Sequence, residues 1–267
     1  MTKRKLDIAL RTCDNNSIHE SRSSTGKRII PSDKPTLIKK CFVSLCNSIE
    51  KTENTDIRLW IYDDHSSEDT KKYLKTVAAN KSIEYYFFNL EEKGHNYSGL
   101  KQFECCRDNG RDWSYSVEDD YLHYPSAIPE FLSMGERFRN MLGTPIGIRP
   151  DDCPMSYTSN TSFRTKPSII FLGNDRHWKT TQHTTQTMFL DSSVFKDYWD
   201  IFAVMAKYYG RLVIFENDTL NKLWDDGVST RGPVPLFSPI PSLAMHITYD
   251  TEPPFTDYKK LWDEIEL

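Results

Sequence analysis

Long apolar runs and an excess of positive charge are both missing from this sequence of 267 residues. No stretch approaches the roughly 18 uninterrupted apolar residues that a membrane span needs. The apolar run at residues 6–10 is too short and too charged for a signal peptide. The net charge of −4 gives the whole protein no attraction for nucleic acid or for an anionic membrane. We therefore expect a soluble, cytoplasmic protein with no nucleic-acid partner and no membrane span.

Paired cysteines and glycine-rich phosphate loops are missing as well. The six cysteines form no CxxC pair, so we expect reduced, structural thiols and no zinc site. The glycine-containing segment at residues 94–99 fits neither the GxGxxG nor the GxxxxGK pattern, so it is neither a dinucleotide fingerprint nor a P-loop. It is either a helix start whose backbone N–H groups face an anion or a plain N-terminal turn.

What the sequence does contain is enough apolar material for one sizeable core. Hydrophobic residues make up 38% of the chain and aromatic residues 13%, which fits a single domain over residues 1–267. Strand and helix signals alternate along the first half. This alternation predicts an α/β fold with a parallel sheet, whose sites gather at the carboxyl ends of the strands. The expected strands cover residues 7–12, 56–62, 83–90 and 113–118, and the expected helices cover 35–51, 67–80 and 97–109.

After residue 125 the pattern is less regular, although helical and strand-like periods are still present. Residues 173–186 are rich in hydrogen-bonding groups and are predicted to be a loop, and residues 232–255 are Pro-rich and extended. The expected helices cover residues 128–141, 194–209 and 218–226, and the expected strands cover 146–148, 169–172 and 187–190.

The most informative stretch is the acidic triplet Glu118-Asp119-Asp120, which follows a short aromatic and β-branched run. Adjacent carboxylates repel one another, so they need either bulk water or a cation. In a strand the side chains alternate, which would send Glu118 and Asp120 to one side and Asp119 to the other. Mg²⁺ and Mn²⁺ take one or two carboxylates and leave other positions to water and substrate phosphates. The triplet is therefore either a platform for a metal and a diphosphate or a solvated acidic turn.

Polar clusters also follow the first two expected strands. Thr12-Cys13-Asp14 follows the first strand and Asp63-Asp64 the second. Because the carboxyl ends of parallel strands meet at one edge of the sheet, we expect these clusters to converge with the acidic triplet. The second cluster can equally be a turn, in which Ser67 caps the helix that follows.

In order and spacing, these motifs resemble the GT-A glycosyltransferases, and in particular the family 2-like transferases that depend on a nucleotide sugar. The resemblance implies a Rossmann-like, mostly parallel central sheet flanked by helices, with an irregular portion on the C-terminal acceptor side. Residues 1–124 would bind the nucleotide and residues 125–267 the acceptor. It also implies a DXD-type acidic motif, here in the form EDD, and a Mn²⁺ or Mg²⁺ cofactor.

The resemblance implies roles for individual residues. Asp120 would bind the metal directly, with His246 as a second ligand, although a lone histidine can also be a packed residue. Phosphates, ribose and base need hydrogen-bonding and charged partners, and carboxylates accept the stronger charge-assisted bonds. The residues expected beside the donor are Arg11, Thr12, Asp14, Asp63, Asp64, Asn96, Gly99, Lys101, Glu118 and Asp119.

A catalytic base is expected near residue 218, where a strand-like run meets a helix. Asp218 is the first candidate and Glu216 the second, because Asn217 stands where the family usually has Glu. These acids can also simply complement the dipole of the helix. The sugar and acceptor side is expected to include Trp178, Thr185 and Arg149, since sugars present hydroxyls around an apolar face.

These observations predict a metal-dependent glycosyltransferase. It would move a sugar from a nucleoside-diphosphate sugar to a hydroxyl of a saccharide or another acceptor. The resemblance to the family favours UDP as the nucleotide and inversion of the anomeric configuration, with retention as the alternative. A sugar nucleotidyltransferase is a second hypothesis, and a non-catalytic carbohydrate-binding module is a third. A metal-dependent nuclease fits the acids alone, but the net negative charge argues against it.

Overall fold

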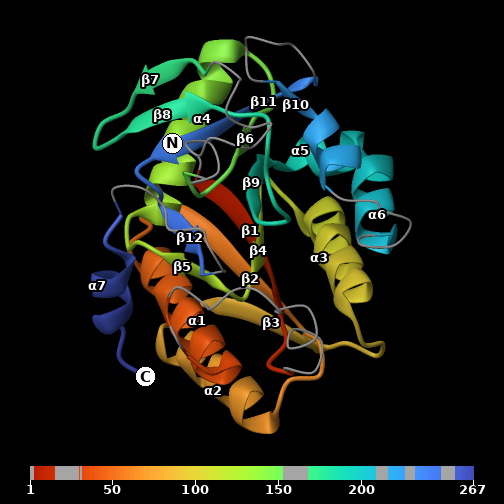
Figure 1. Ribbon diagram of the computed structural model, residues 1–267, viewed down its shortest axis with the longest axis vertical. Coiled ribbons are helices and arrows are strands. Elements are labelled where there is room, and N and C mark those ends of the chain that lie inside the picture. Colours follow the sequence, from red (N-terminus) through yellow and green to blue (C-terminus); the bar gives the residue numbers. More distant parts are fainter. Residues whose placement is uncertain are drawn as a thin grey trace.

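A ten-stranded mixed sheet forms the centre of the protein, in the order β3-β2-β1-β4-β9-β6-β11-β8-β7 with β10 paired to β11 (Figure 1). The computed structural model describes residues 3–15, 30, 32–152, 168–208, 216–225, 232–247 and 256–267. The strands are β1 Arg4–Thr12, β2 Thr55–Asp63, β3 Glu84–Asn89, β4 Trp113–Glu118, β6 Gly147–Ile148, β7 Ile170–Leu172, β8 His177–Thr180, β9 Met188–Asp191, β10 Trp224–Asp225 and β11 Val234–Ile240.

The first half is the predicted parallel sheet with crossover helices. Strands β1 to β4 all run parallel, and they are joined by α1 (Lys34–Glu50), α2 (Glu68–Asn80) and α3 (His95–Asn109). Both of the first two helices begin at a side-chain cap, since Asp33 accepts from the N–H of Thr36 and Ser67 accepts from that of Thr70. The prediction that Ser67 caps a helix is confirmed. Of the helices described, none is both long and apolar enough to cross a membrane.

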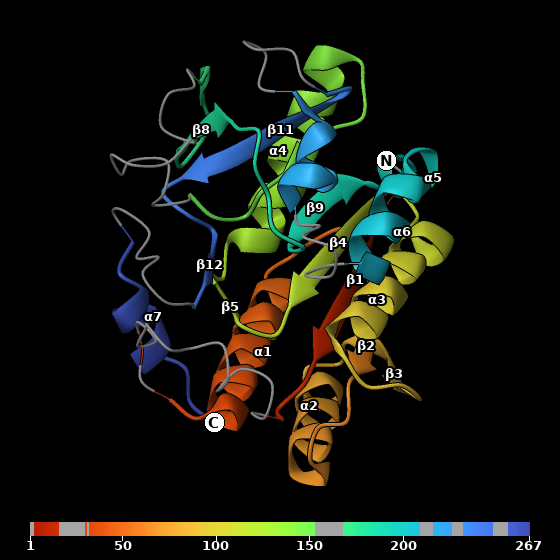
Figure 2. The same cartoon turned by 45° about the vertical axis from the view of Figure 1, so that its right-hand side comes forward.

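Two apolar layers enclose the sheet, and the alternation along β1 assigns its side chains to them. Leu6, Ile8 and Leu10 face the larger cluster, which includes side chains of α1, of α2 and of α4 (Ala127–Leu142). Ala9 faces the opposite cluster, formed with α3, α5 (Ser192–Asp197) and α6 (Trp199–Tyr208) (Figures 1 and 2). Strand β1 is therefore buried on both faces, as a central parallel strand should be.

The second half departs from the prediction at three places. Strand β8 lies inside the segment that was expected to be a loop, where it pairs antiparallel with β11. The helix expected over residues 194–209 is divided into α5 and α6, and the chain turns between them. The helix expected over residues 218–226 is wrong: the structure has two 3₁₀ turns, η3 (Glu216–Asp218) and η4 (Leu220–Lys222), followed by β10.

A separate two-stranded sheet lies beside the end of β4. Strand β5 (Tyr121–His123) pairs antiparallel with β12 (Ala244–His246), which joins the acidic triplet to the C-terminal part of the chain. Its apolar face packs on α1 and on the last helix, α7 (Tyr258–Asp263), within a third cluster of buried side chains. The Nζ of Lys40 donates to the carbonyl of Trp262 over 2.8 Å and lies 5.0 Å from the centre of its ring.

His123 is a buried histidine whose two ring nitrogens have separate roles. Its Nδ1 lies 3.0 Å from the carbonyl oxygen of Tyr121 and its Nε2 lies 2.8 Å from the hydroxyl of Tyr115. Because a carbonyl only accepts, Nδ1 must carry the ring proton, so Nε2 accepts from the Tyr115 hydroxyl. Burial lowers the pKa of His123 to about 3, although the hydrogen bond to the Tyr121 carbonyl opposes this.

We predict that His123 makes the protein less stable in acid. The histidine of the unfolded chain titrates near its ordinary pKa of about 6.5. Between about pH 6.5 and pH 3 the unfolded chain therefore binds a proton that the native protein does not. The free energy of unfolding should fall, on account of this group, by about 1.4 kcal/mol for each pH unit below 6.5.

Urea unfolding of the wild type and His123→Gln between pH 4.5 and 7.5 checks this. The variant should be less stable at neutral pH, but its stability should depend less steeply on pH than that of the wild type. His177→Gln, at an exposed position of β8, is the control and should keep the wild-type slope. Equal slopes in wild type and His123→Gln would contradict the prediction.

Candidate functional site

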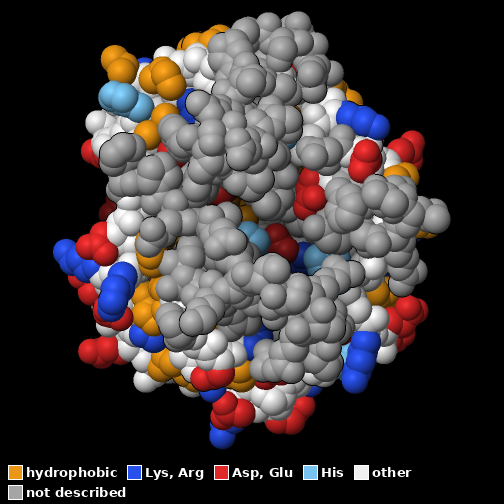
Figure 3. All heavy atoms as spheres, viewed as in Figure 1, with side chains coloured by type: hydrophobic (Ala, Val, Ile, Leu, Met, Phe, Trp, Pro, Cys, Tyr) orange, Lys and Arg blue, Asp and Glu red, His pale blue; other side chains and the backbone are white. Residues whose placement is uncertain are grey.

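The candidate site lies at the carboxyl ends of β1 and β4, where the sequence places its first polar cluster and the acidic triplet. The two strands are neighbours, and Arg11 is the register partner of Glu118. In the space-filling view, His, Asp or Glu, and Lys or Arg side chains lie together at the centre of this face (Figure 3). The predicted convergence of separate segments on one edge of the sheet is therefore present.

Each carboxylate of the acidic triplet has its own cationic partner. Glu118 forms an ion pair with Arg11 of β1. Asp119 forms one with Lys34 at the start of α1, at 2.6 Å, and also accepts from the N–H of Cys13 at 2.8 Å. The three acids thus do not depend on bulk water alone, because protein side chains supply two of the compensating charges and His246 can supply the third.

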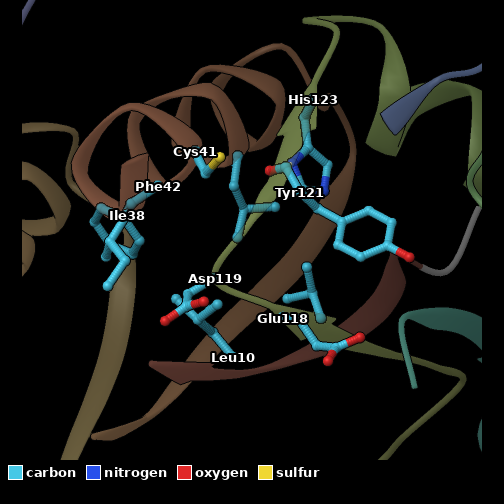
Figure 4. A pocket seen from close by; sticks show the side chains of 10 residues that line it. Leu10, Ile38, Cys41, Phe42, Glu118, Asp119, Tyr121 and His123 are labelled. Carbon is cyan, nitrogen blue, oxygen red and sulfur yellow. The ribbon is translucent and has the colours of Figure 1, made fainter. Parts of the chain in front are cut away.

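The side chains of Glu118 and Asp119 point in opposite directions, as strand alternation predicts (Figure 4). Between them lies a small pocket of about 10 Å³, close to the space that one water molecule needs. It is closed on the α1 side by Ile38, Cys41 and Phe42. This space is therefore large enough for about one water molecule and too small for a nucleotide.

Asp120 and His246 form the third pair. The Nε2 of His246 lies 3.2 Å from Oδ2 of Asp120, and the N–H of Ile247 donates to the Asp120 carbonyl at 2.9 Å. Burial lowers the pKa of His246, but the charge of Asp120, the hydrogen bond to it and the charges of Glu118 and Asp151 together outweigh burial and raise the pKa to about 9. Burial would raise the pKa of Asp120, and the same pairing instead holds it below its usual range. The other carboxylate oxygen, Oδ1, is buried and has no partner among the described residues.

The Asp120–His246 pair is a plausible place for a divalent cation on chemical grounds. Within the described part of the chain, no group of three or more His, Cys, Asp or Glu side chains comes together as a metal site. Two protein ligands are enough for Mg²⁺ or Mn²⁺ when water and phosphate oxygens complete the coordination. The unpartnered Oδ1 supplies a free acceptor, and His246 becomes a ligand once it loses its proton. The residues present therefore fit the implied metal.

Arg11 also contacts His95, which the sequence analysis did not select. The Nη1 of Arg11 lies 3.1 Å from Nδ1 of His95, and because guanidinium only donates, this ring nitrogen must accept. The ring proton is then on Nε2, which lies 2.9 Å from the side-chain amide of Gln186. The amide oxygen of Gln186 should therefore face His95, since it can accept that proton. The sequence analysis named the neighbouring Asn96 but not His95. The contact with Arg11 that identifies His95 is visible only in the structure.

Gly99 has a steric reason for being glycine. A Cβ at this position would lie 3.2 Å from the end of the Gln186 side-chain amide that points away from His95, and 3.6 Å from Nη1 of Arg11. Helix α3 therefore approaches these two side chains more closely than a larger residue would comfortably allow.

The buried polar segment Gln182–Thr187, which we call the polar loop, connects the parts of the site. Its Thr187 hydroxyl contacts Glu118, and the Thr185 hydroxyl lies 2.7 Å from the Tyr121 hydroxyl. The N–H of Thr184 donates to Oδ1 of Asn221, which attaches η4 to this loop. The candidate bases precede η4 in η3, where Glu216 is half-buried and Asp218 is exposed, and neither stands at the start of an α-helix as predicted.

Several residues expected beside the donor make hydrogen bonds or ion pairs within the protein. Asp14 accepts from the N–H and hydroxyl of Ser67 at the start of α2, and Asp64 accepts from the N–H of Gly94. Asn96 donates to the carbonyl of Ala206. Lys101, in the second turn of α3, pairs with Glu104. Arg149, which was expected on the sugar and acceptor side, follows β6, pairs with Asp151 and donates to the carbonyl of His183 at 3.2 Å.

Two further placements bear on the predicted site. Thr12 and Asp63 are register partners, and both are buried, with Oγ1 of Thr12 and Oδ1 of Asp63 lacking partners among the described residues. Trp178 corrects the prediction of a sugar-stacking residue. Its ring is 0% exposed and packs at 5.8 Å from the ring of Phe138, so neither of its faces is open to a sugar.

The fold is similar to that of solved structures. The structure of S. aureus TarS 1–349 matches with a TM-score of 0.51 at 12% identity, over 88% of this chain and 60% of that chain. TarS 1–349 in complex with UDP has a TM-score of 0.46 at 13% identity, over 76% and 55%. M. tuberculosis glucosyl-3-phosphoglycerate synthase has a TM-score of 0.33 at 11% identity, over 55% and 44%.

The first of these similarities establishes the fold. The chain has a GT-A-type fold, with a mostly parallel central sheet flanked by helices, as expected from the sequence. It spans 60% of the length of that TarS structure. No family model matches the chain, and no curated protein matches it in sequence.

We predict that the Lys34–Asp119 pair contributes strongly to stability, because both side chains are nearly buried. Lys34→Met would leave the Asp119 carboxylate buried without its cation, which typically costs about 3–5 kcal/mol. The double variant with Asp119→Asn should recover part of this loss, because it removes the uncompensated charge. Urea unfolding at neutral pH gives the free energies.

The matched control is Lys39→Met on the same helix. Its partner Asp69 has a side chain that is 80% exposed, so this pair should contribute no more than about 1 kcal/mol. A loss in Lys34→Met no larger than that in Lys39→Met would show that the buried pair is not a stabilising contact.

Proposed function

We propose that this protein is a metal-dependent glycosyltransferase that moves a sugar from a nucleoside-diphosphate sugar to an acceptor hydroxyl. The observation that carries the proposal is the half-buried Asp120–His246 pair, with one buried Asp120 oxygen unpartnered, at the carboxyl edge of a GT-A-type sheet. Ligand sites of open α/β sheets lie at this edge. A carbohydrate-binding module has no need for such a pair.

Asp120 and His246 would hold Mn²⁺ or Mg²⁺ in this proposal. The cation would neutralise the charge that develops on the leaving diphosphate. Glu118 and Asp119 would take a different part, because Arg11 and Lys34 already compensate them. Their ion pairs would keep the Asp120 backbone in place at the end of β4, so that the free oxygen of Asp120 faces the diphosphate.

UDP is the nucleotide that we favour. TarS 1–349, which has a similar fold, is described in complexes with UDP and with UDP-GlcNAc. In this chain the nucleotide would lie beside Arg11 and Thr12 at the end of β1, and the unpartnered polar atoms of Thr12 and Asp63 are candidates for contacts with it. The sugar would extend towards the polar loop and Thr185.

Asp218 is the proposed base, with Glu216 as second choice. A positioned carboxylate that takes the proton of the acceptor hydroxyl contributes roughly 10²–10⁴-fold to the rate. Attack by that hydroxyl on the side opposite the diphosphate would invert the anomeric configuration. The contact between Asn221 and Thr184 supports this choice, because it attaches the segment after Asp218 to the polar loop.

We predict that UDP stabilises the protein only in the presence of the metal. A ligand that binds the native state alone raises the free energy of unfolding by about 2.7 kcal/mol at one hundred times its Kd. Thermal unfolding with UDP should therefore shift upwards with Mn²⁺ and not with EDTA. The shift should be lost in Asp120→Asn and in His246→Gln.

Asp191→Asn is the matched control, since Asp191 is the register partner of Trp113 at the opposite end of β4. It should keep the metal-dependent shift. If no nucleotide stabilises the wild type with any divalent cation, the proposed donor site is wrong.

We predict that Asp218→Asn reduces turnover by roughly 10²–10⁴-fold while nucleotide binding is retained. The assay measures release of UDP from UDP-sugars, with water or added saccharides as the acceptor. Glu216→Gln should have the smaller effect, and the exposed Asp200→Asn of α6 should have none.

Unchanged turnover in Asp218→Asn combined with a large loss in Glu216→Gln would reassign the base to Glu216. Incubation of the wild type with UTP and a sugar phosphate is the comparison assay. Pyrophosphate release there, without UDP release from UDP-sugars, would instead identify a sugar nucleotidyltransferase.

A further inference from the structure

Tyr121 links the Asp120–His246 pair to the polar loop. Strands β5 and β12 pair antiparallel, and their register places Tyr121 directly opposite His246. Cross-strand partners of an antiparallel pair project to the same face, so these two side chains must meet. Their rings are stacked, with the centroids 4.8 Å apart and the planes inclined by 7°.

The stack leaves the imidazole little freedom to rotate. Tyr121 is fully buried and follows Asp120 directly, so its ring is fixed by packing on one side of His246. The edge of the imidazole then directs Nε2 at Asp120, 3.2 Å from Oδ2. The face of an aromatic ring also attracts a cation, so the stack favours a positively charged or metal-bound imidazole.

The hydroxyl of Tyr121 extends the contact beyond the pair. It lies 2.7 Å from Oγ1 of Thr185, in the polar loop that also contacts Glu118 through Thr187. Tyr121 is therefore held at both ends: its backbone is in the β5 ladder, and its hydroxyl is bound to Thr185.

We propose that Tyr121 is a positioning residue, which fixes the imidazole of His246 in the orientation that serves Asp120 and a bound cation. This inference rests on the proposed function for the identity of the cation. The orientation of the ring is a property of the metal-free protein. Residues that orient a metal-binding histidine commonly change metal affinity about 10–100-fold when they are replaced.

The first test is the affinity of the full chain for Mn²⁺ alone, measured by electron paramagnetic resonance of the free ion. Tyr121→Leu removes the ring and should weaken binding by about 10–100-fold. Tyr121→Phe keeps the ring and loses only the hydroxyl, so its affinity should lie close to that of the wild type. Thr185→Val removes the same hydrogen bond and should match Tyr121→Phe.

Two controls separate positioning from a general loss of stability. Leu122→Ala truncates the next residue of β5, which is also fully buried but faces the cluster with α1 and α7. Tyr115→Phe removes a buried hydroxyl that bonds to His123 instead of Thr185. Both should keep the wild-type affinity for Mn²⁺. Equal weakening in Leu122→Ala and Tyr121→Leu, or unchanged affinity in Tyr121→Leu, would overturn the proposal.

The second test needs no metal. A cycle of Tyr121→Leu, His246→Gln and the double variant compares urea midpoints in EDTA. If the rings restrain each other, the double variant shifts the midpoint by less than the sum of the two single shifts. Additive shifts overturn the proposal. If the wild type fails to bind Mn²⁺, the proposed metal role of His246 fails, and this cycle alone decides the positioning role.

Discussion

Three adjacent carboxylates at the end of a buried strand repel one another, and in this protein charges from elsewhere in the chain compensate them. The partners of Glu118, Asp119 and Asp120 come from β1, from the start of α1 and from β12. Strand alternation separates Glu118 from Asp119, so no single cation could serve both. The order β2-β1-β4 and the pairing of β5 with β12 bring these distant segments to one edge, and the acidic triplet is compatible with the fold because of that topology.

The three carboxylates of the acidic triplet are compensated to different degrees. They therefore differ in how many acceptor oxygens remain for a ligand. Both oxygens of Glu118 contact a donor, Arg11 on one and Thr187 on the other, and both oxygens of Asp119 do as well. Asp120 has one oxygen left over. Within the described part of the chain, Glu118 and Asp119 therefore have both carboxylate oxygens bound within the protein, and Asp120 keeps one free acceptor. An acid that is fully paired stabilises the strand end, whereas one with an unpaired oxygen keeps an acceptor that a cation or another ligand can use.

The sequence predicts the first half of the fold well because strand and helix signals alternate there and because capping side chains mark the starts of α1 and α2. It fails at β8, where Lys179 and Trp178 look like surface residues, although Lys179 is buried against Asp152 and Trp178 lies in the core. The prediction of a helix after residue 218 also fails. Two 3₁₀ turns form there, and Asn221 accepts from the N–H of Thr184 in the polar loop. The sequence alone identified the acidic triplet as a candidate site. Lys34, which pairs with Asp119, and His95, which contacts Arg11, were not predicted, because they are 85 and 84 residues away from the side chains they contact.

His246, the second candidate for a metal ligand, lies in the two-stranded sheet of β5 and β12. A two-stranded sheet is marginally stable at best when it is isolated. Its apolar face is covered by α1 and α7, and Lys40 joins these helices through the carbonyl and ring of Trp262. Helix α1 also carries Lys34, so one helix contacts both Asp119 and the support of His246. The two halves of the candidate site, one at the end of β4 and the other on β12, therefore contact the same helix. They are also joined directly, because β12 pairs with β5, which follows Asp120 in the chain.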